Sequence, residues 1–172
     1  MLTFIKGTMM IEITKINNRK QKANICDIVL HSLPKWFEVE SSIANYIEDT
    51  QSLPFWVAFD EGVPIGFVSL KKHNTFTSEI CVMGILESYH RKGIGKMFLE
   101  NVEYYCKENK QVFLTVKTLD ETSGSKSYAK TREFYLSMGF APLEIFPLFW
   151  NEENPCLFMA KYLGNNEVSM SR

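Results

Sequence analysis

A strong excess of charge of either sign is absent from this sequence of 172 residues. Its 19 lysines and arginines almost balance its 20 aspartates and glutamates, so the formal net charge is −1. A surface that binds nucleic acid in general carries a strong positive charge. We therefore expect no nucleic acid among the partners, although the sequence can still form a local basic cluster.

Long apolar runs are also absent. No run approaches the roughly 18 to 20 apolar residues that a helix needs to span a bilayer. The N-terminal segment, MLTFIKGTMM, lacks the long apolar stretch and the small-residue cleavage site of a signal peptide. The sequence thus predicts a cytoplasmic protein without a membrane partner.

Paired cysteine motifs are missing as well. The four cysteines, Cys26, Cys81, Cys106 and Cys156, are spread along the chain. Zinc ligands usually stand much closer together in a sequence. We expect buried, reduced thiols, no metal site and no catalytic cysteine.

The pattern that is present fits one continuous domain. A chain of 172 residues can bury a substantial core, and we find neither an internal repeat nor a low-complexity linker. We expect a flexible extension over residues 1–9, a single domain over residues 10–163 and a flexible tail over residues 164–172.

Hydrophobic periodicity predicts the order β-α-α-β-β-β-α-β-α-β-β. Neighbouring strands early in this order can pair antiparallel, and a strand–helix–strand crossover in the middle brings two strands together in parallel. The predicted fold class is α/β (α+β), with a mixed, mostly antiparallel central sheet of about seven strands flanked by helices. The predicted strands cover residues 11–16, 54–60, 65–71, 77–86, 111–116, 140–149 and 156–162, and the predicted helices cover residues 20–33, 39–48, about 94–106 and about 128–138.

A glycine-rich basic turn, HRKGIGK at residues 90–96, lies between the strand predicted at 77–86 and an amphipathic helix. Unpaired N–H groups and the dipole at a helix start favour a phosphate or pyrophosphate, and Gly93 and Gly95 let the backbone approach it closely. A dinucleotide fingerprint would need glycine at Phe98, and a P-loop would need Ser or Thr at Met97. Taken alone, the turn is more typical of a helix start with solvated charges and no ligand.

Two further segments give this turn a context. The sequence EICVMGIL precedes it, and TREFYLSMGF follows the next predicted strand. Together with ESYHRKGIGKMFLENVEYYC, they resemble the GNAT superfamily of acyl-CoA-dependent N-acyltransferases. The order of elements from about residue 10 to residue 163 is also similar to the fold of that family. The pyrophosphate loop of the family, Gln/Arg-x-x-Gly-x-Gly/Ala, corresponds to residues 90–95, with His90 in place of Gln or Arg.

The resemblance implies a GNAT-like fold and acetyl-CoA as the co-substrate. In the family, the pantetheine arm lies along the strand before the loop, which implies Met83, Gly84 and Ile85 here. A glycine at position 84 fits close approach to the backbone, and it fits a bulge without a ligand equally well. The residues implied in holding the pyrophosphate are His90, Arg91, Lys92, Gly93, Ile94, Gly95 and Lys96.

The resemblance also implies two catalytic residues. Tyr135 matches the tyrosine of the family element FYxxxGF, which donates a proton to the leaving CoA thiolate; its helical spacing alone is that of a core aromatic. Glu79 matches the glutamate of a strand of the form E-I-x-x-x-x-I and would act as the base. Because about 20 Å of extended strand separates it from Ile85, we expect it to act through one or two waters. The alternative is a solvated glutamate at the start of the strand.

The acceptor side is less clearly encoded. Phe146, Phe149 and Trp150 lie near a turn that contains Glu152 and Glu153. This segment can seat an amine, pack in the core or form a dimer contact, so a homodimer stays among the expected assemblies. His31 and His73 have no partner pattern, and we expect them to be surface or satisfied residues.

The expected function is an N-acetyltransferase that moves the acetyl group of acetyl-CoA to a primary amine of a small molecule or peptide by direct attack. The alternative is a non-catalytic acyl-CoA-binding or sensing module, and the presence of Tyr135 argues against it. A nucleotide phosphate-binding domain of another kind is disfavoured by the missing P-loop and dinucleotide patterns.

Overall fold

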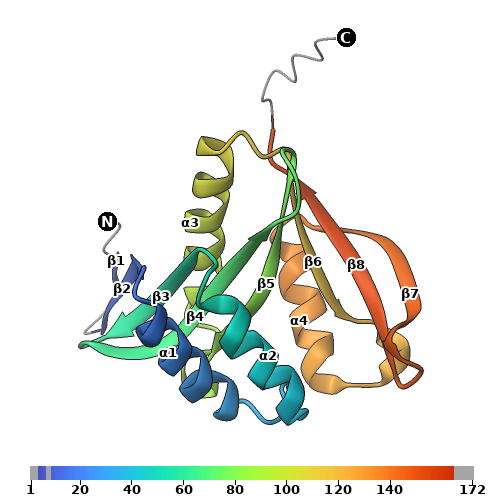
Figure 1. The fold of residues 1–172 in the computed structure, drawn as a ribbon, viewed down its shortest axis with the longest axis horizontal. Coiled ribbons are helices and arrows are strands. Elements are labelled where there is room, and N and C mark those ends of the chain that lie inside the picture. The colour runs from blue at the N-terminus through green and yellow to red at the C-terminus, as the bar shows by residue number, and fades with distance from the viewer. Residues whose placement is uncertain (1–3, 7–8, 165–172) are drawn as a thin grey trace. The chain divides into compact units, whose positions relative to one another are not determined.

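The strands and helices follow the predicted order closely (Figure 1). The structure is a computed structural model, which describes residues 4–6 and 9–164. The strands are β1 (Phe4–Lys6), β2 (Met9–Lys15), β3 (Phe55–Asp60), β4 (Val63–Lys72), β5 (Thr77–Ile85), β6 (Phe113–Leu119), β7 (Ala141–Asn151) and β8 (Asn154–Tyr162). The helices are α1 (Arg19–His31), α2 (Glu40–Thr50), α3 (Ile94–Glu108) and α4 (Lys126–Ser137), with the short 3-10 helices η1 (Glu87–Tyr89) and η2 (Glu121–Ser123).

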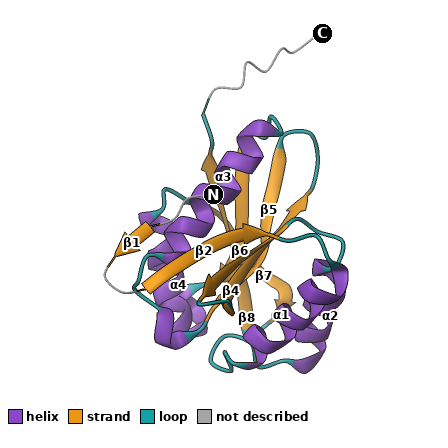
Figure 2. Ribbon diagram, turned by 90° about the vertical axis from the view of Figure 1, so that its left-hand side faces the viewer, coloured by secondary structure: helices purple, strands orange, loops and turns teal. Residues whose placement is uncertain are grey.

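The strands form a mixed sheet. β5 and β6 pair in parallel, whereas β1–β2, β2–β3, β3–β4, β6–β8 and β7–β8 pair antiparallel. The order is β1-β2-β3-β4-β5-β6-β8-β7, in a sheet of eight strands. The predicted mixed, mostly antiparallel sheet with flanking helices is confirmed (Figure 2). Among the described residues, it has one strand more than the seven or so expected.

The additional strand is β1, within the segment expected to be a flexible extension. Its residues pair with the start of β2, from Phe4↔Ile11 to Lys6↔Met9. Three residues are too short a window for alternation to predict a strand. Of the other positions expected to be flexible, Met9 is the first residue of β2 and Gly164 is described as a loop residue, whereas 1–3, 7–8 and 165–172 lie outside the described residues.

The chain divides into two compact units, which are described separately. The first comprises Met1–Lys71 and Cys81–Val102, and the second comprises Lys72–Ile80 and Glu103–Arg172. The boundary falls within β4, β5 and α3, so these three elements contribute residues to each unit.

The core of the first unit lies where α1 packs on the strands. Asn18 caps α1, because its side chain accepts a hydrogen bond from the backbone N–H of Gln21 at 2.9 Å. Apolar residues at helical spacing then turn one face of α1 inward, and Val29 is completely buried. The same cluster contains Phe55 and Phe67, whose rings stack with centroids 4.8 Å apart. α2 lies beside α1 (Figure 1).

In the second unit, α4 follows β6 through η2. Ser125 caps α4 by accepting a hydrogen bond from the backbone N–H of Tyr128 at 3.3 Å. Arg132 in turn donates from Nη1 to the backbone oxygen of Leu119 at 2.8 Å, which ties the helix to the end of β6. Gly139, with φ of +89°, follows the helix in the left-handed conformation typical of a C-terminal cap.

Among the described residues, none of the helices combines the length and apolar character that crossing a membrane requires.

Candidate active site

β5 has one buried face and one half-exposed face. The exposure alternates residue by residue, as it does in a strand covered mainly on one side. The buried set is Ser78, Ile80, Val82 and Gly84, and the half-exposed set is Glu79, Cys81, Met83 and Ile85. The predicted base and two of the three predicted pantetheine residues therefore share one face of a single strand.

The parallel ladder with β6 covers only the first part of β5. Among the described residues, its register runs from Thr77↔Phe113 to Ile80↔Val116. β5 itself continues to Ile85. The predicted pantetheine segment thus lies beyond the residues that this ladder includes.

Gly84 leaves little space between β5 and the helix that packs on it. A Cβ at this position would lie 3.0 Å from Cγ1 of Val29 and 3.2 Å from Cδ1 of Leu33. Side chains of α1 therefore approach the backbone at Gly84 from the buried face of β5. A bulge is not needed to explain this glycine.

The turn before α3 is shaped by backbone conformation. Arg91 and Gly93 both have positive φ values, 63° and 83°. α3 begins at Ile94, and the backbone oxygen of Gly93 accepts its first helical hydrogen bond from Met97 at 3.1 Å. The N–H groups of the first helical turn have no acceptor four residues earlier. A Cβ on Gly93 would meet no atom within 4 Å, so the space beside the turn is open.

His90 faces back toward β5. Its Nε2 lies 2.6 Å from the backbone oxygen of Ile85, which can only accept, so Nε2 carries the proton. The imidazole also packs edge-on against Trp36, with ring centroids 5.3 Å apart. By contrast, Arg91 and Lys92 are exposed. Of the four basic residues predicted to attract the pyrophosphate, His90 is the one that hydrogen-bonds the end of β5, and Nζ of Lys92 lies 4.7 Å from the ring centroid of Tyr89.

Tyr135 lies almost completely buried in α4, with 4% of its surface exposed. Its ring makes edge contacts with Phe134 and Phe140, each at a centroid distance of 5.2 Å. Burial, with a smaller contribution from Tyr128, raises the pKa of Tyr135 well above its ordinary value. The phenol therefore keeps its proton at neutral pH and can act as a donor.

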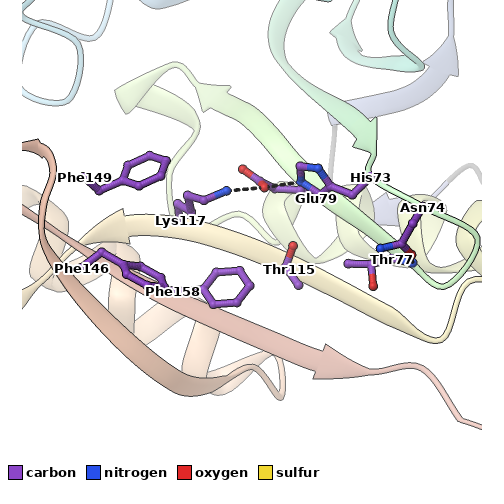
Figure 3. A pocket seen from close by; sticks show the side chains of 9 residues that line it. All are labelled: His73, Asn74, Thr77, Glu79, Thr115, Lys117, Phe146, Phe149 and Phe158. Atoms are coloured by element: carbon purple, nitrogen blue, oxygen red, sulfur yellow. Dashed lines mark hydrogen bonds and ion pairs between the residues drawn. The ribbon is translucent and has the colours of Figure 1, made fainter.

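A pocket in the second unit is built around Glu79 (Figure 3). Oε2 of Glu79 lies 2.5 Å from Nζ of Lys117 and accepts a hydrogen bond from Nε2 of His73 at 2.6 Å. The cavity has a volume of about 370 Å³. Its lining residues are His73, Asn74, Thr77, Glu79, Thr115, Lys117, Phe146, Phe149 and Phe158. A solvated glutamate is excluded, because only 13% of the Glu79 side chain is exposed.

Strand register brings these polar residues together. Glu79 pairs with Thr115 in the parallel ladder, and Lys117 follows two residues later on the same face of β6. Lys117 is also directly opposite Phe158 of β8. His73 follows β4, and its backbone N–H donates to the oxygen of Thr77 at 3.0 Å, which closes the β4–β5 turn.

Sequence reasoning did not single out Lys117. His73 was expected to be a surface or satisfied residue, and it is both, with 37% of its side chain exposed and an ion pair to Glu79; its place in the lining of the pocket was not predicted. The sequence carries only part of the information that brings these residues together. Thr115 and Lys117 have the two-residue spacing of one strand face, but they are placed beside Glu79 only once the β5–β6 register is known. That register is a long-range property.

The aromatic segment of β7 contributes one wall of the pocket. Phe146 packs against Phe149 and Phe158, with ring centroids 6.4 and 6.1 Å apart. Phe149 remains 53% exposed and Trp150 43% exposed, so core packing does not account for them. Phe146 and Phe149, which were expected on the acceptor side, thus line a cavity. Trp150 only contacts Phe149 edge-on, with ring centroids 5.6 Å apart.

Three of the four cysteines are buried as expected, and Cys81 is partly exposed. Burial raises the pKa of Cys26 to about 12 and that of Cys106 and Cys156 to about 11, so these thiols stay protonated at neutral pH. Within residues 4–6 and 9–164, no group of three or more His, Cys, Asp or Glu side chains is placed to hold a metal ion.

Comparison with known proteins decides the family. Residues 12–140 match the sequence model of the Acetyltransferase (GNAT) family. The chain belongs to this family. The resemblance of the glycine-rich turn and of the FYxxxGF element is therefore confirmed at the level of the family, and the expectation of an acetyltransferase with it.

Individual GNAT relatives agree with this assignment. The chain is 28% identical over 157 residues to an uncharacterized N-acetyltransferase, YsnE, of Bacillus subtilis (strain 168), covering 90% of this chain and 100% of that protein. A solved GNAT-family protein from Desulfovibrio desulfuricans superposes with a TM-score of 0.76 at 16% identity, covering 90% and 99% of the two chains. A GNAT family acetyltransferase from Elizabethkingia anophelis, solved with acetyl-CoA bound, gives a TM-score of 0.64 at 17% identity, covering 88% and 97%. These structures support the GNAT fold.

Proposed function

We propose that this GNAT protein is an acetyl-CoA-dependent N-acetyltransferase that acetylates a primary amine of a small molecule or peptide by direct attack. The observation that carries the proposal is the open turn with positive φ at Arg91 and Gly93 that starts α3. Such a turn presents backbone N–H groups and a helix dipole to an anion. The GNAT neighbour with bound acetyl-CoA supports that compound as the donor. Because the family match at residues 12–140 runs across both units, it supports these residues as part of the single domain that we propose for residues 10–163.

The donor side of the proposed site uses mainly backbone. The amides of residues 91–96 would hold the pyrophosphate, with Arg91, Lys92 and Lys96 adding positive charge. Met83, Gly84 and Ile85 would hold the pantetheine arm by adding it to β5 as an extra strand. His90 fixes the carbonyl group of Ile85 at 2.6 Å and would keep that end of the strand in place.

The acceptor side uses side chains. Acetyl-CoA supplies the acetyl group as a thioester. Glu79 would take the proton of the acceptor ammonium through one or two waters, so that the free amine can attack the thioester carbon. Tyr135, protonated at neutral pH, would donate to the sulfur as the C–S bond breaks. A backbone amide near Ile85 would donate to the oxyanion.

One observation favours the alternative of a non-catalytic acyl-CoA-binding module. Oε2 of Glu79 already contacts both Lys117 and His73, which a base must release or share. The acetyltransferase and the binding module predict different turnover and the same acetyl-CoA binding, so turnover and binding must both be measured.

Isothermal titration of the purified protein with acetyl-CoA, CoA and ATP is the first test, followed by release of free thiol in the presence of amine acceptors. We expect micromolar binding of both CoA species and much weaker binding of ATP. Thiol release that depends on an amine would support the enzyme. Binding without release from any amine would support the sensing module, and no binding of either CoA species would overturn both.

A further inference from the structure

We propose that His90 and Trp36 are positioning residues that aim the backbone N–H of Ile85 at the oxygen of the donor thioester. This inference rests on the proposed acetyl transfer, since it names the residues that hold the oxyanion donor in place. It gives His90 a task different from the pyrophosphate contact that its place in the turn predicts. All the residues that carry the inference belong to the first unit.

The peptide group between Ile85 and Leu86 is held at both of its polar ends. Its N–H, which belongs to Leu86, donates to the backbone oxygen of Ile65 in β4 at 2.9 Å. Its carbonyl oxygen, which belongs to Ile85, accepts a hydrogen bond from Nε2 of His90 at 2.6 Å. The two ends of a trans peptide point in opposite directions, so the carbonyl group of Ile85 points away from β4. His90 therefore fixes the side of this peptide that β4 does not hold.

The same orientation applies to the N–H of Ile85. In an extended strand, the N–H and the C=O of one residue point to the same edge. β5 extends to Ile85, so this N–H also points away from β4, toward the edge at which the pantetheine arm would be added. A donor stabilises an oxyanion well only when it is already aimed at the position where the charge forms. Movement at this end of β5 would therefore reduce the rate more than the affinity for the donor.

The imidazole of His90 is itself held by the connection between α1 and α2. Trp36 packs edge-on against it, with ring centroids 5.3 Å apart. The preceding residue, Lys35, forms an ion pair of 2.8 Å with Glu87 in η1. The backbone N–H of Trp36 donates to the oxygen of Leu33 at 3.0 Å, which joins this connection to the end of α1. Two successive residues of the connection thus contact the segment that follows β5.

The end of β5 is also supported from its buried face. A Cβ at Gly84 would lie 3.0 Å from Cγ1 of Val29 and 3.2 Å from Cδ1 of Leu33. One run of chain, from Val29 to Trp36, therefore packs under the strand and also contacts His90. A group held in this way needs little reorganisation when the reaction begins.

The decisive experiment removes the N–H donor of His90 and keeps an aromatic ring. His90→Phe retains a ring beside Trp36, whereas His90→Gln retains a side-chain N–H that can donate to Ile85. Rates are measured with acetyl-CoA and with S-acetylpantetheine, which has the same thioester and lacks the pyrophosphate. In His90→Phe, we expect kcat with acetyl-CoA and kcat/KM with S-acetylpantetheine to fall about tenfold each.

Affinity and rescue separate this role from a contact with the pyrophosphate. The dissociation constant of CoA should stay within about twofold in His90→Phe, because the amides of the turn are unchanged. His90→Gln should recover most of the lost rate. A loss that is confined to acetyl-CoA and matched by weaker CoA binding would overturn the inference, and so would a rate in His90→Gln as low as in His90→Phe.

A double-mutant cycle tests the part of Trp36. We expect Trp36→Leu to lower kcat about threefold, and to add nothing in the His90→Phe background, since Trp36 acts through His90. His31→Phe is the matched control, because His31 lies in the same unit and its ring contacts Asp27 and Glu40. It should leave kcat unchanged. Additive losses from Trp36 and His90, or an equal loss in His31→Phe, would overturn the coupling.

Nuclear magnetic resonance checks the hydrogen bond without turnover. Long-range ¹H–¹⁵N spectra of the imidazoles are recorded without donor at about pH 8, where histidine is ordinarily neutral. The protein has three histidines, so the signal missing in His90→Phe identifies His90. We expect its proton on Nε2, and a mixture of tautomers in Trp36→Leu. A proton on Nδ1 would overturn the inference and leave the acetyltransferase intact. Failure of acetyl-CoA to bind, with the proton on Nε2, would overturn the proposed function instead.

Discussion

The turn that opens α3 and the pocket around Glu79 differ in the part of the chain that would recognise a ligand. The turn would contact a ligand through its backbone, whose conformation is set by positive φ at Arg91 and Gly93 and which presents the amides of one helix start. The pocket would contact a ligand through side chains, and Glu79, Lys117 and His73 come from three different segments. Backbone recognition needs a short contiguous motif, whereas side-chain recognition needs the correct strand register. A fold can therefore keep the backbone turn constant and vary the side chains of the pocket, so that one scaffold serves many substrates.

Removing the charge of Glu79 should give the largest difference between the pocket and the turn, because turnover should fall while acetyl-CoA binding is kept. In Glu79→Gln, the shape of the side chain is kept and the proton acceptor is lost. We expect kcat to fall by about a hundredfold or more, while the acetyl-CoA dissociation constant stays within about twofold, as measured by thiol release and calorimetry.

Glu103→Gln is the matched control for this change. It also removes a carboxylate from a 2.5 Å ion pair with a lysine, and its side chain is 19% exposed against 13% for Glu79. Both variants lose an ion pair, so a general loss of stability would affect them alike. Turnover that survives in Glu79→Gln would mean that this carboxylate is structural.

Tyr135→Phe, in α4, also tests whether turnover can be lost while acetyl-CoA binding is kept. The edge contacts with Phe134 and Phe140 involve the ring, which phenylalanine retains. We expect kcat to fall by about ten- to a hundredfold with unchanged acetyl-CoA binding, since only the phenolic donor is lost. An unchanged kcat would identify Tyr135 as a core aromatic, the alternative that its helical spacing suggests.

Local signals in the sequence predicted most of the fold. The helices at 19–31 and 94–108 and the strands β3, β5 and β8 each have a periodicity or a bounding turn within a few residues. β1 was missed because three residues show no period, and β1 is defined by its pairing with β2. Local pattern therefore sufficed wherever an element was long enough to display it.

The candidate site was predictable only where it is local. The turn at residues 90–96 was located from its glycines and basic residues, but the orientation of His90 toward Ile85 depends on where the end of β5 lies. Lys117 is 38 residues from Glu79 in the sequence, and nothing near either residue indicates the other. Only the pairing of Glu79 with Thr115 places them on adjacent strands.

Gly93→Ala tests whether the backbone of the turn that opens α3 holds acetyl-CoA. Gly93 and Gly62 have almost the same φ, 83° and 80°, and a Cβ would meet no atom within 4 Å at either position. Alanine at either site should cost about 1–2 kcal/mol of stability, because an L-residue is strained in this region. Gly62 closes the β3–β4 hairpin, so only Gly93→Ala should weaken acetyl-CoA binding.

We expect that weakening to be about tenfold, which corresponds to about 1.4 kcal/mol. Calorimetry gives the affinity, and urea unfolding checks that both variants lose similar stability. Equal acetyl-CoA affinity in the two variants would mean that the turn does not hold the pyrophosphate.

The smallest effect is expected in the pH dependence of stability, and it probes the buried donor directly. Burial raises the pKa of Tyr135 above its ordinary value. Below about pH 10, the phenol is protonated in both the folded and unfolded states, and the stabilisation is fully present. Above that pH, the unfolded state loses the proton while the folded state keeps it. The unfolded state then binds fewer protons, so the free energy of unfolding falls as the pH rises.

From this residue we expect a loss of about 0.8 kcal/mol between pH 9 and pH 10.5. Tyr135→Phe has no proton to lose at this position, so its unfolding free energy should decline less steeply by that amount in urea titrations at matched pH. Parallel curves would mean that the phenol ionises as easily in the folded protein as in the unfolded one. In that case it would not be the firmly protonated donor that the proposed mechanism requires. The same measurement therefore tests the burial of Tyr135 and its fitness as the donor, without any ligand present.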